Sequence, residues 1–435
     1  MNRAYFCVIL NTMLFSKTFA KTRKEAPKDE ISKNAELLIR GGFINKEMAG
    51  VYAYLPLGLR VLGNIERVVR EEMDAIGGQE ILMTTLQNPE IWKKTGRWND
   101  AVVDNWFKTQ LKTGGDVGIA NTHEEPITEL LTHFVSSYKD LPLALYQFQT
   151  KFRNELRAKS GILRTREFLM KDLYSFSRSE NEFKEFYEKC ADAYMKIFKR
   201  IGIGEKTYRT IAGGGSFTAG LTHEFQTLSD AGEDIIYVDE KRRLAINKEA
   251  YTDENCAAFK LKKEDLIERK SIEVGNIFPL GSVYAQKIGL FFTDEDGKKM
   301  PVFMGSYGIG LPRLMGTVVE VLSDEKGIVW PHEITPYQFH ILHVPSTNDR
   351  VKEAALRLYE DIIKAGFQVL YDDRDLSAGV KFADADLIGA PFILIVSEKT
   401  LQNGLIAEIK FRKEGAVKPI PALFAVSKWS YPFKI

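Results

Sequence analysis

Cysteine and histidine are scarce in this sequence, with 3 and 6 copies among 435 residues. The cysteines, Cys7, Cys190 and Cys256, are far apart and form no CxxC pair, which argues against a disulfide framework and a structural zinc. The histidines show no HExxH or similar spacing, so we expect no transition-metal site. This composition fits a reducing compartment and predicts a cytoplasmic protein.

Long apolar runs and excess charge are also lacking. No segment approaches the ~18 uninterrupted apolar residues that a membrane span needs, so we expect no membrane partner. The net charge is +1, and any nucleic-acid contact therefore has to use local patches. With 44% hydrophobic and 27% charged residues, the chain has the balance of a globular protein long enough for two domains.

The first twenty residues, MNRAYFCVILNTMLFSKTFA, allow three interpretations. The apolar run after Arg3 looks like a short secretory h-region, and the absence of acidic residues also suits a transit peptide. Asn11 and Thr12 interrupt the run, and no small-x-small cleavage site follows. We favour the third interpretation, a spurious upstream start with initiation at Met13 or later, and treat residues 1–28 as a lead. Organellar targeting by this lead stays open.

Periodicity predicts the elements that follow. Apolar residues recur every three or four positions over 62–76, which predicts an amphipathic helix, and the strand-like EILMTTL comes after it. An arginine-rich loop joins the strand-like stretches LPLALYQFQ and EFLMKDLYSF. A helix is expected over SENEFKEFYEKCADAYMKIFKRIG, antiparallel strands over 201–238, and a helix over about 311–322. Residues 239–272 are charged and read as an insertion. From FHILHV onward, strands and helices alternate, which predicts a small α/β domain with a mixed sheet.

The stretch VFMGSYGIGLPRL places Gly308 and Gly310 on one face of a strand. Two missing side chains on that face let a flat ligand approach closely, and Arg313, at the start of the next helix, can meet a phosphate. A glycine-rich strand packed under a helix is an equally open interpretation of this stretch alone.

The stretch FRNE places Arg153 and Glu155 two residues apart, so on a strand they would face the same way. The planar fork of arginine suits a phosphate and a carboxylate together, and a glutamate can accept from an exocyclic amine. Phe168, beyond the loop, could stack on a purine. Elsewhere these would be a solvated charged loop and a core phenylalanine. Together they describe a pocket for a bent ATP.

FRNE resembles motif 2 of the class II aminoacyl-tRNA synthetases, and GSYGIGLPR resembles their motif 3. GGQEILMTTLQNPEIW looks like motif 1, which normally forms the dimer interface. THEE at 122–125, THEF at 222–225, EVGNIFPLG at 273–281 and DDRDLSAGVKFADADLIGAP are similar to the prolyl-tRNA synthetases. The resemblance runs from about residue 29 to the end.

This resemblance implies an α+β fold: a class II synthetase antiparallel sheet flanked by helices over 29–330, and a small α/β anticodon-binding domain over 335–435. Residues 239–272 would stand where many bacterial relatives carry a large editing domain. The implied reaction activates L-proline with Mg²⁺-ATP to prolyl-adenylate and transfers the prolyl group to the 3′ end of tRNA-Pro. The implied assembly is a homodimer through motif 1.

For ATP, the resemblance implies that Arg153 bridges the substrate carboxylate and the α-phosphate, and that Arg313 holds the γ-phosphate. These two are the implied catalytic residues. Glu155 would accept from the adenine amine, with Phe168 stacked on the ring. The remaining implied ATP-binding residues are Arg164, Gly308 and Gly310.

For proline, Thr122 and Glu124 would accept the two N–H donors of the secondary ammonium, and His223 would lie beside the ring. Taken alone, Glu124 also fits a helix N-terminus and His223 a structural histidine. Ser306 stands where many bacterial relatives carry cysteine, and we expect it to line the proline pocket with Arg153.

For tRNA, the resemblance makes three residues of the C-terminal domain candidates for reading anticodon bases: Arg374, Lys381 and Asp384. A solvated charged surface is the competing interpretation for each. Arg157 and Lys159, in the motif 2 loop, are candidates for the acceptor end.

The short 239–272 segment leaves too few residues for an editing domain. We therefore expect the enzyme to misactivate alanine, with a separate trans-editing protein or simple tolerance limiting the damage. The sequence also allows two other functions. The chain could be an adenylate-forming relative with another acceptor, or an RNA-binding accessory protein with an inactive site. The C-terminal domain disfavours the first. The retained Arg153, Glu155 and Arg313 disfavour the second.

Overall fold

The computed structural model describes residues 12–156, 158, 160–215, 217–218 and 220–421. Contacts divide the chain into two compact units. The central unit comprises residues 47–52 and 65–317. Of the described residues, the C-terminal unit comprises 318–421 together with 12–46 and 53–64 from the N-terminal part of the chain. Arg157 and Lys159 lie outside the described residues.

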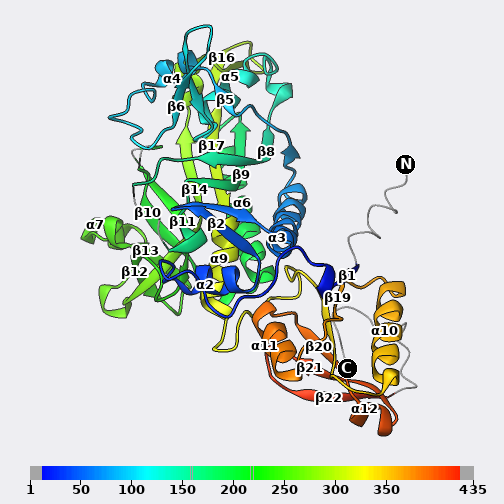
Figure 1. Ribbon diagram of the computed structural model, residues 1–435. Helices are drawn as coiled ribbons and strands as arrows, with labels where there is room; N and C mark the ends of the chain where they lie inside the picture. The colour runs from blue at the N-terminus through cyan, green and yellow to red at the C-terminus, as the bar shows by residue number, and fades with distance from the viewer. Residues whose placement is uncertain (1–11, 157, 159, 216, 219, 422–435) are drawn as a thin grey trace. The chain divides into compact units, whose positions relative to one another are not determined.

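A nine-stranded sheet forms the core of the central unit, in the order β11-β10-β13-β12-β14-β17-β9-β8-β4 (Figure 1). Neighbouring strands are antiparallel except for the parallel pairs β10–β13 and β4–β8. The strands are β4 (Gln79–Glu80), β8 (Leu143–Phe152), β9 (Glu167–Ser177), β10 (Thr207–Gly213), β11 (Leu221–Leu228), β12 (Asp234–Asp239), β13 (Leu244–Asn247), β14 (Ile267–Gly281) and β17 (Phe303–Gly310). This confirms the predicted antiparallel class II sheet.

Helix α6 (Glu180–Arg200) packs on one face of this sheet, against β9, β14 and β17. Its N-terminus is capped by the Ser179 side chain, which accepts from the Glu182 N–H. A Cβ at Gly305 would lie 2.8 Å from the Phe183 ring of α6. Gly305 therefore lets the helix approach the sheet closely.

Shorter elements complete the central unit. A three-stranded sheet consists of β5 (Leu86–Gln87), β6 (Lys108–Gln110) and β7 (Asp116–Ile119), and β15 (Phe291–Thr293) pairs with β16 (Lys299–Pro301). The helices are α4 (Pro89–Thr95), α5 (Glu124–Leu131), α7 (Asp253–Ala258) and α8 (Val283–Ile288). Four elements have residues in both units: β2 (Ile44–Met48), β3 (Val51–Tyr54), α3 (Pro56–Ala75) and α9 (Leu311–Leu322).

The helix predicted over 62–76 is confirmed within α3, whose apolar stripe is buried. The single strand predicted over EILMTTL is wrong, because the chain leaves the sheet after β4 and pairs again only at β5. Side chains replace the strand ladder there: the Gln147 Oε1 accepts from the Met83 N–H at 2.9 Å, and the Gln149 amide donates to the Met83 carbonyl.

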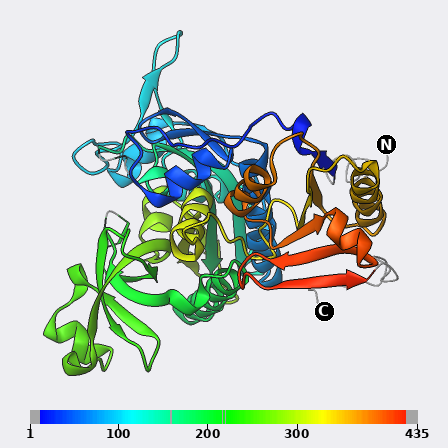
Figure 2. The ribbon, with the colours of Figure 1, turned by 60° about the horizontal axis from the view of Figure 1, so that its bottom comes forward.

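The stretch that reads as an insertion, residues 239–272, is partly built into the sheet. Strand β13 lies between β10 and β12, and α7 follows it. Ile246 and Cys256 from this stretch pack with Ile211 of β10. Figure 2 shows this green region around β12, β13 and α7 as a lobe at one end of the central sheet.

The C-terminal unit contains the six-stranded mixed sheet β1-β19-β18-β20-β21-β22. Helices α10 and α11 cover opposite faces, since Phe339 and Ile341 of β18 pack with α10 while Leu342 packs with Ala385 of α11. The predicted strand–helix alternation is confirmed. The elements are β18 (Phe339–His343), α10 (Asp349–Lys364), β19 (Val369–Asp372), α11 (Ala378–Ile388), β20 (Phe392–Val396), α12 (Glu398–Gln402), β21 (Leu405–Phe411) and β22 (Val417–Pro421), with α2 (Lys33–Arg40) earlier in the chain.

Part of the segment that the sequence assigns to a lead belongs to this sheet. Strand β1 (Thr12–Leu14) pairs in parallel with β19, and the following Phe15 is 2% exposed. The Ser16 hydroxyl donates to the Asp373 carboxylate at 2.5 Å. The chain from residue 12 onward is therefore part of the folded C-terminal unit. Among the described residues, no helix is both long and apolar enough to cross a membrane.

Candidate active site

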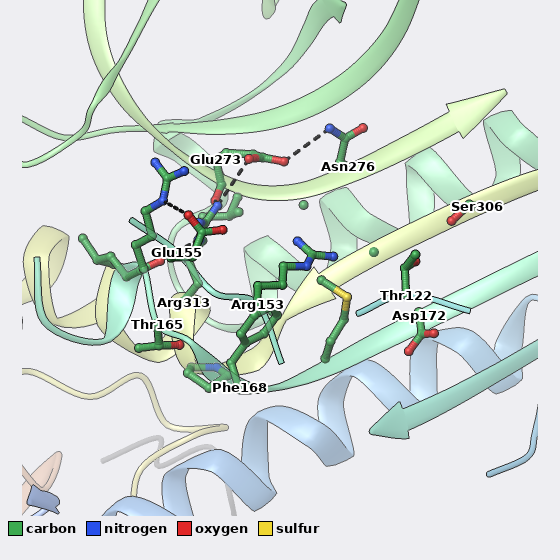
Figure 3. A pocket seen from close by; sticks show the side chains of 18 of the residues that line it. Thr122, Arg153, Glu155, Thr165, Phe168, Asp172, Glu273, Asn276, Ser306 and Arg313 are labelled. Atoms are coloured by element: carbon green, nitrogen blue, oxygen red, sulfur yellow. Dashed lines mark hydrogen bonds and ion pairs between the residues drawn. The ribbon is translucent and has the colours of Figure 1, made fainter. Parts of the chain in front are cut away.

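A cavity of about 270 Å³ opens on the face of the central sheet formed by β9, β17 and β14 (Figure 3). Alternation along each strand and the cross-strand register together select its floor. Ser306 lies opposite Tyr174 and Phe278, and Gly308 lies opposite Asp172 and Asn276. Two rows of residues from three strands therefore share one surface.

The two glycines of this floor leave space. A Cβ at Gly308 would meet nothing closer than Met170 Cε at 3.7 Å, and one at Gly310 nothing closer than Arg313 Cβ at 3.7 Å. Tight packing under a helix, the competing interpretation of the glycines, therefore does not apply to this pair. It applies to Gly305 instead, whose Cβ would lie 2.4 Å from the Tyr307 hydroxyl.

Arg153 and Arg313 line this one cavity although 160 positions separate them in the sequence. Among the described residues, the Arg153 guanidinium hydrogen-bonds only the Asn121 carbonyl, at 3.4 Å, and lies 5.4 Å from the Phe168 ring centroid. The Arg313 Nε donates to the Leu163 carbonyl at 2.7 Å, and its NH1 lies 3.3 Å from a Glu273 carboxylate oxygen. Two cations are thus held apart in one chamber, as a bent polyanion requires.

Glu155 also lines the cavity, but not through strand alternation as expected. β8 ends at Phe152, and the Glu155 N–H donates to the Arg153 carbonyl in a turn. The Glu155 carboxylate accepts from the Arg164 Nε at 3.0 Å, and Arg164 is also on the cavity wall. The arginine-rich loop is therefore divided: Arg164 faces the cavity, whereas the Arg166 NH1 donates to the Ala49 carbonyl.

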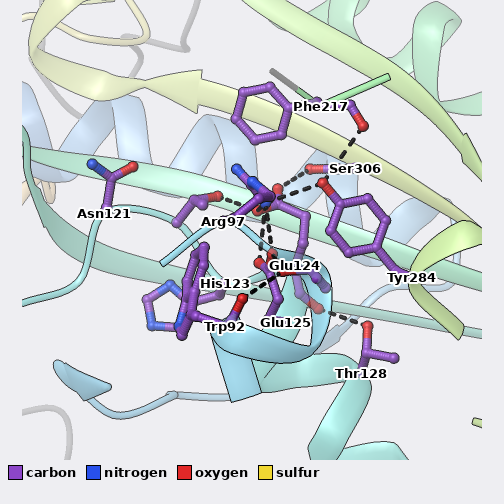
Figure 4. A network of polar contacts seen from close by, with 12 residues as sticks. Trp92, Arg97, Asn121, His123, Glu124, Glu125, Thr128, Phe217, Tyr284 and Ser306 are labelled. Atoms are coloured by element: carbon purple, nitrogen blue, oxygen red, sulfur yellow. Dashed lines mark hydrogen bonds and ion pairs between the residues drawn. The ribbon is translucent and has the colours of Figure 1, made fainter. Parts of the chain in front are cut away.

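The opposite end of the cavity contains a buried carboxylate (Figure 4). Glu124, the first residue of α5, is 1% exposed. The Thr122 hydroxyl donates to one Glu124 oxygen at 2.5 Å, and the Ser306 hydroxyl donates to the other at 2.9 Å. Each hydroxyl keeps lone pairs that can accept from a ligand. Thr122, Glu124 and Ser306 are thus brought together as predicted.

A buried charge cluster lies next to Glu124. The Lys151 ammonium is 2.9 Å from the Asp172 carboxylate, and it contacts His123 Nδ1 at 2.7 Å. Burial and the neighbouring Lys151 lower the pKa of His123 to about 4. Burial also lowers the pKa of Lys151, which Asp172 opposes. The neutral imidazole can accept from Lys151, so the cluster is hydrogen-bonded beneath the cavity.

Carboxylates gather next to Arg313 as well. Asn276 Nδ2 lies 3.4 Å from a Glu224 oxygen and 3.3 Å from a Glu273 oxygen. Burial and the charge of Glu273 raise the pKa of Glu224 to about 8. In the part of the chain that the structure describes, no group of three or more His, Cys, Asp or Glu side chains is arranged to enclose a metal ion. The two carboxylates, Glu224 and Glu273, are nonetheless oxygen ligands of the kind that Mg²⁺ shares with phosphates.

His223 is not among the described residues that line the cavity. Strand alternation places it on the α6 face of β11, where its Nδ1 lies 2.9 Å from the Tyr187 hydroxyl. Burial, together with Arg209, lowers its pKa to about 4. The structure thus places it where the competing interpretation, a structural histidine, expects it.

The anticodon candidates of the C-terminal unit form one internal network. The Arg374 NH2 contacts Asp372 at 2.7 Å and Asp384 at 2.8 Å, and its guanidinium carbon lies 3.7 Å from the Phe15 ring centroid. Lys381 is 1% exposed and donates to the His343 carbonyl at 3.2 Å. Arg157 and Lys159, the acceptor-end candidates, lie outside the described residues.

Sequence reasoning missed much of the cavity wall, including Met170, Asp172, Tyr174, Phe217, Glu273, Asn276 and Phe278. The first three follow Phe168 at every second position of β9, so strand periodicity could have found them. Phe217 comes from the loop after β10, which has no such period.

Two known domain families match this chain. Residues 107–322 match the model of the tRNA synthetase class II core domain (G, H, P, S and T), and residues 338–428 match the anticodon binding domain. The nine-stranded antiparallel sheet, the cavity with its paired arginines and the appended α/β unit define a class II aminoacyl-tRNA synthetase.

Relatives specify the family. The chain is 38% identical over 442 residues to a proline–tRNA ligase of Caulobacter sp. (strain K31), covering 96% of this chain and 98% of that protein. It is 37% identical over 424 residues to one of Rickettsia bellii (strain OSU 85-389), covering 94% and 96%. The chain belongs to the prolyl-tRNA synthetase family, the class II ligases that attach proline to tRNA-Pro.

Solved structures share the fold. A prolyl-tRNA synthetase from Cryptosporidium parvum complexed with halofuginone and AMPPNP matches with a TM-score of 0.74 and 16% identity, covering 88% of this chain and 73% of that one. The same protein complexed with L-proline and AMP matches with a TM-score of 0.71, covering 90% and 74%.

Proposed function

We propose that this one cavity activates L-proline with ATP and then passes the prolyl group to tRNA-Pro. The observation that supports it is the convergence of Arg153 and Arg313 on one chamber whose far end contains the buried carboxylate of Glu124. A nucleotide bent between the two arginines would have its α-phosphate next to a proline seated at Glu124.

In the activation step, Arg153 binds the proline carboxylate and the α-phosphate together. This offsets the repulsion between the two anions and holds them for in-line attack. The attacking carboxylate is already ionised, so no side chain has to remove a proton. Glu155 accepts from the adenine amine, Phe168 stacks on the ring, and Arg313 holds the terminal phosphate. Arg164, Gly308 and Gly310 complete the nucleotide site.

At the proline end, Glu124 and Thr122 accept the two N–H donors of the secondary ammonium. Because the Thr122 hydroxyl donates to Glu124, its lone pairs stay available to accept from a ligand. Ser306 orients the other oxygen of Glu124 and lines the pocket. His223 lies on the far side of β11 against Tyr187, so the proposal gives it no contact with the proline ring.

Mg²⁺ enters with ATP, and Glu273 and Glu224 would hold it together with phosphate oxygens. Bound there, it supplies charge neutralisation of the pyrophosphate leaving group. The raised pKa of Glu224 fits this assignment, because two carboxylates close together favour a bound cation or proton.

The remaining parts of the proposal concern partners. The catalytic domain would span 29–330 and the anticodon-binding domain 335–435, with Arg374, Lys381 and Asp384 shaping the anticodon surface and Arg157 and Lys159 touching the acceptor end. A homodimer would form through the motif 1 segment, where Leu82 and Leu86 are 75% and 55% exposed. We place the enzyme in the cytoplasm.

Proline-dependent exchange of pyrophosphate into ATP tests the activation step. We expect exchange with proline and not with threonine or histidine when amino acids are supplied singly. Absence of exchange with proline, or exchange with one of the others, contradicts the proposal. Charging of tRNA-Pro with labelled proline tests the second step.

A further inference from the structure

We propose that Arg97 is a positioning residue for the amino-acid substrate, which holds both the carboxylate of Glu124 and the ring of Phe217 from behind the cavity. This inference rests on the proposed function, because it assigns Glu124 to the substrate ammonium. Arg97 is 6% exposed and is not among the described residues that line the cavity.

The turn after α4 directs Arg97 inward. The helix ends at Thr95, and Gly96 adopts a left-handed conformation with φ of 83°. This conformation is open to glycine at no steric cost. The Arg97 N–H then donates to the Trp92 carbonyl at 3.1 Å, which fixes the direction of the chain.

The guanidinium meets two carboxylates on one side (Figure 4). Its NH1 lies 3.0 and 3.1 Å from the two oxygens of Glu125, and 3.6 Å from the nearer oxygen of Glu124. The same NH1 donates to the Tyr284 hydroxyl at 3.0 Å. A buried guanidinium persists only with such compensation, so its position and those of the carboxylates determine one another.

Aromatic rings surround the other faces of the guanidinium. Its central carbon lies 4.8 Å from the Phe217 ring centroid, 5.2 Å from that of Trp92 and 5.7 Å from that of Tyr284. Phe217 lines the cavity and packs 4.6 Å from Phe278. Cation–π attraction to a desolvated arginine therefore anchors a pocket ring that comes from a loop.

The net charge of Arg97 and the two carboxylates also affects binding of the substrate ammonium. Two carboxylates face one guanidinium, so that when both are ionised one negative charge is left in excess for the substrate ammonium to balance. Burial raises the pKa of Glu125 to about 7, and Arg97 opposes this rise. Without Arg97, the two carboxylates would share a site as like charges and take up a proton near neutral pH. Other charged or titratable groups that interact with the pair are Tyr174, Tyr284, His123, Lys151 and Arg153.

The test is Arg97→Met, which keeps the side-chain length and removes the charge. In pyrophosphate exchange, we expect the KM for proline to rise about tenfold or more, as for loss of a charged hydrogen bond, while the KM for ATP stays within about twofold. The KM for proline should also fall as the pH rises from 6 to 8, more steeply than in the wild type, since loss of Arg97 raises the pKa of Glu125 further and its proton removes negative charge next to the ammonium.

Arg97→Lys restores the charge without the fork, so it should return the shallow pH profile but not the full affinity. If Arg97→Met does not fold, the affinity loss in Arg97→Lys decides the question. Arg412→Met is the matched control: Arg412 is 2% exposed and forked to Asp324 in the C-terminal unit, and its loss should leave both KM values unchanged.

A folded Arg97 variant with an unchanged KM for proline, or with proline and ATP affected alike, overturns the inference. The proposed function has a separate test. Wild-type enzyme that does not exchange with proline refutes the function, whereas a wild-type exchange that Arg97 does not influence refutes only the role of Arg97.

Discussion

At the scale of single residues, the form of the cation matters more than its sign. Arg153 has a planar fork that can bind a carboxylate and a phosphate together, and among described residues it hydrogen-bonds only one carbonyl at 3.4 Å. The other N–H donors of its guanidinium are thus available to a ligand. The Arg178 guanidinium, in contrast, donates to the Glu182 carboxylate at the surface.

Arg153→Lys therefore separates charge from geometry. We expect proline-dependent pyrophosphate exchange to fall about 10²–10³-fold, the typical loss when one preorganised donor is removed, without a change in the thermal unfolding midpoint beyond a few degrees. Arg178→Lys serves as the control and should exchange at the wild-type rate. Near-wild-type exchange by Arg153→Lys would show that a point charge is enough.

A second residue-level prediction concerns His340. It is fully buried in the C-terminal unit, and neither ring nitrogen has a hydrogen-bond partner among the described residues. Burial lowers its pKa to about 4, with Arg374 adding to the effect against the opposing Asp372. The folded state thus binds this proton less tightly than the unfolded state, in which the pKa is about 6.5.

Neutral His340 therefore makes the stability of the folded protein depend on pH. The stability associated with neutral His340 is present above pH 6.5 and is lost as the pH falls from about 6.5 toward 4, by up to about 1.4 kcal/mol per pH unit. His340→Leu should reduce the acid sensitivity of unfolding by one proton. Denaturant unfolding at pH 7 and pH 5 measures this. An equal loss in variant and wild type would contradict it.

At the scale of elements, β17 combines two uses of glycine in one strand. Gly305 faces α6 and removes a side chain that would collide with Phe183 and Tyr307, whereas Gly308 faces the cavity and leaves room for a ligand. The sequence motif contains both kinds without distinguishing them. Only the direction of each Cβ separates packing from binding.

Gly308→Ala should fold with unchanged stability and lose adenylate formation, because its methyl group meets no protein atom closer than 3.7 Å and instead fills the ligand space. Gly305→Ala should lose about 1–3 kcal/mol of stability through overpacking. Thermal unfolding and pyrophosphate exchange, measured on both variants, give opposite patterns. Normal exchange by Gly308→Ala would exclude it from the nucleotide site.

At the scale of the whole molecule, the stretch of chain between β12 and β14 is too short to form a separate hydrolytic domain. It contains β13 and α7. A pocket sized for the proline ring cannot exclude a smaller amino acid by collision. Each missing methylene gives only about 1–3 kcal/mol of discrimination.

We therefore expect the enzyme to activate alanine and to leave Ala-tRNA-Pro intact, either for a separate trans-editing protein to clear or to be tolerated. Alanine-dependent pyrophosphate exchange measures the first part. For the second, mischarged Ala-tRNA-Pro is incubated with and without the enzyme, with spontaneous decay as the baseline. Faster decay in the presence of the enzyme would contradict the expectation.

The sequence by itself determined the class of fold, the family and most of the residues that we propose bind the nucleotide. Periodicity locates α3, α6 and the elements of the C-terminal sheet, because their apolar faces are local patterns. The motifs supply Arg153, Glu155 and Arg313, which line one cavity and which the proposed function assigns to a bent triphosphate.

Tertiary structure alone decided which side each candidate faces and what lies behind it. His223 points to α6, Gly308 to the cavity and Arg97 to Glu124, and these directions depend on strand register and on contacts between segments far apart in the chain. The hydrophobic pattern of a strand says that its faces differ, but the strands and helices that pack on it determine which face binds and which is buried.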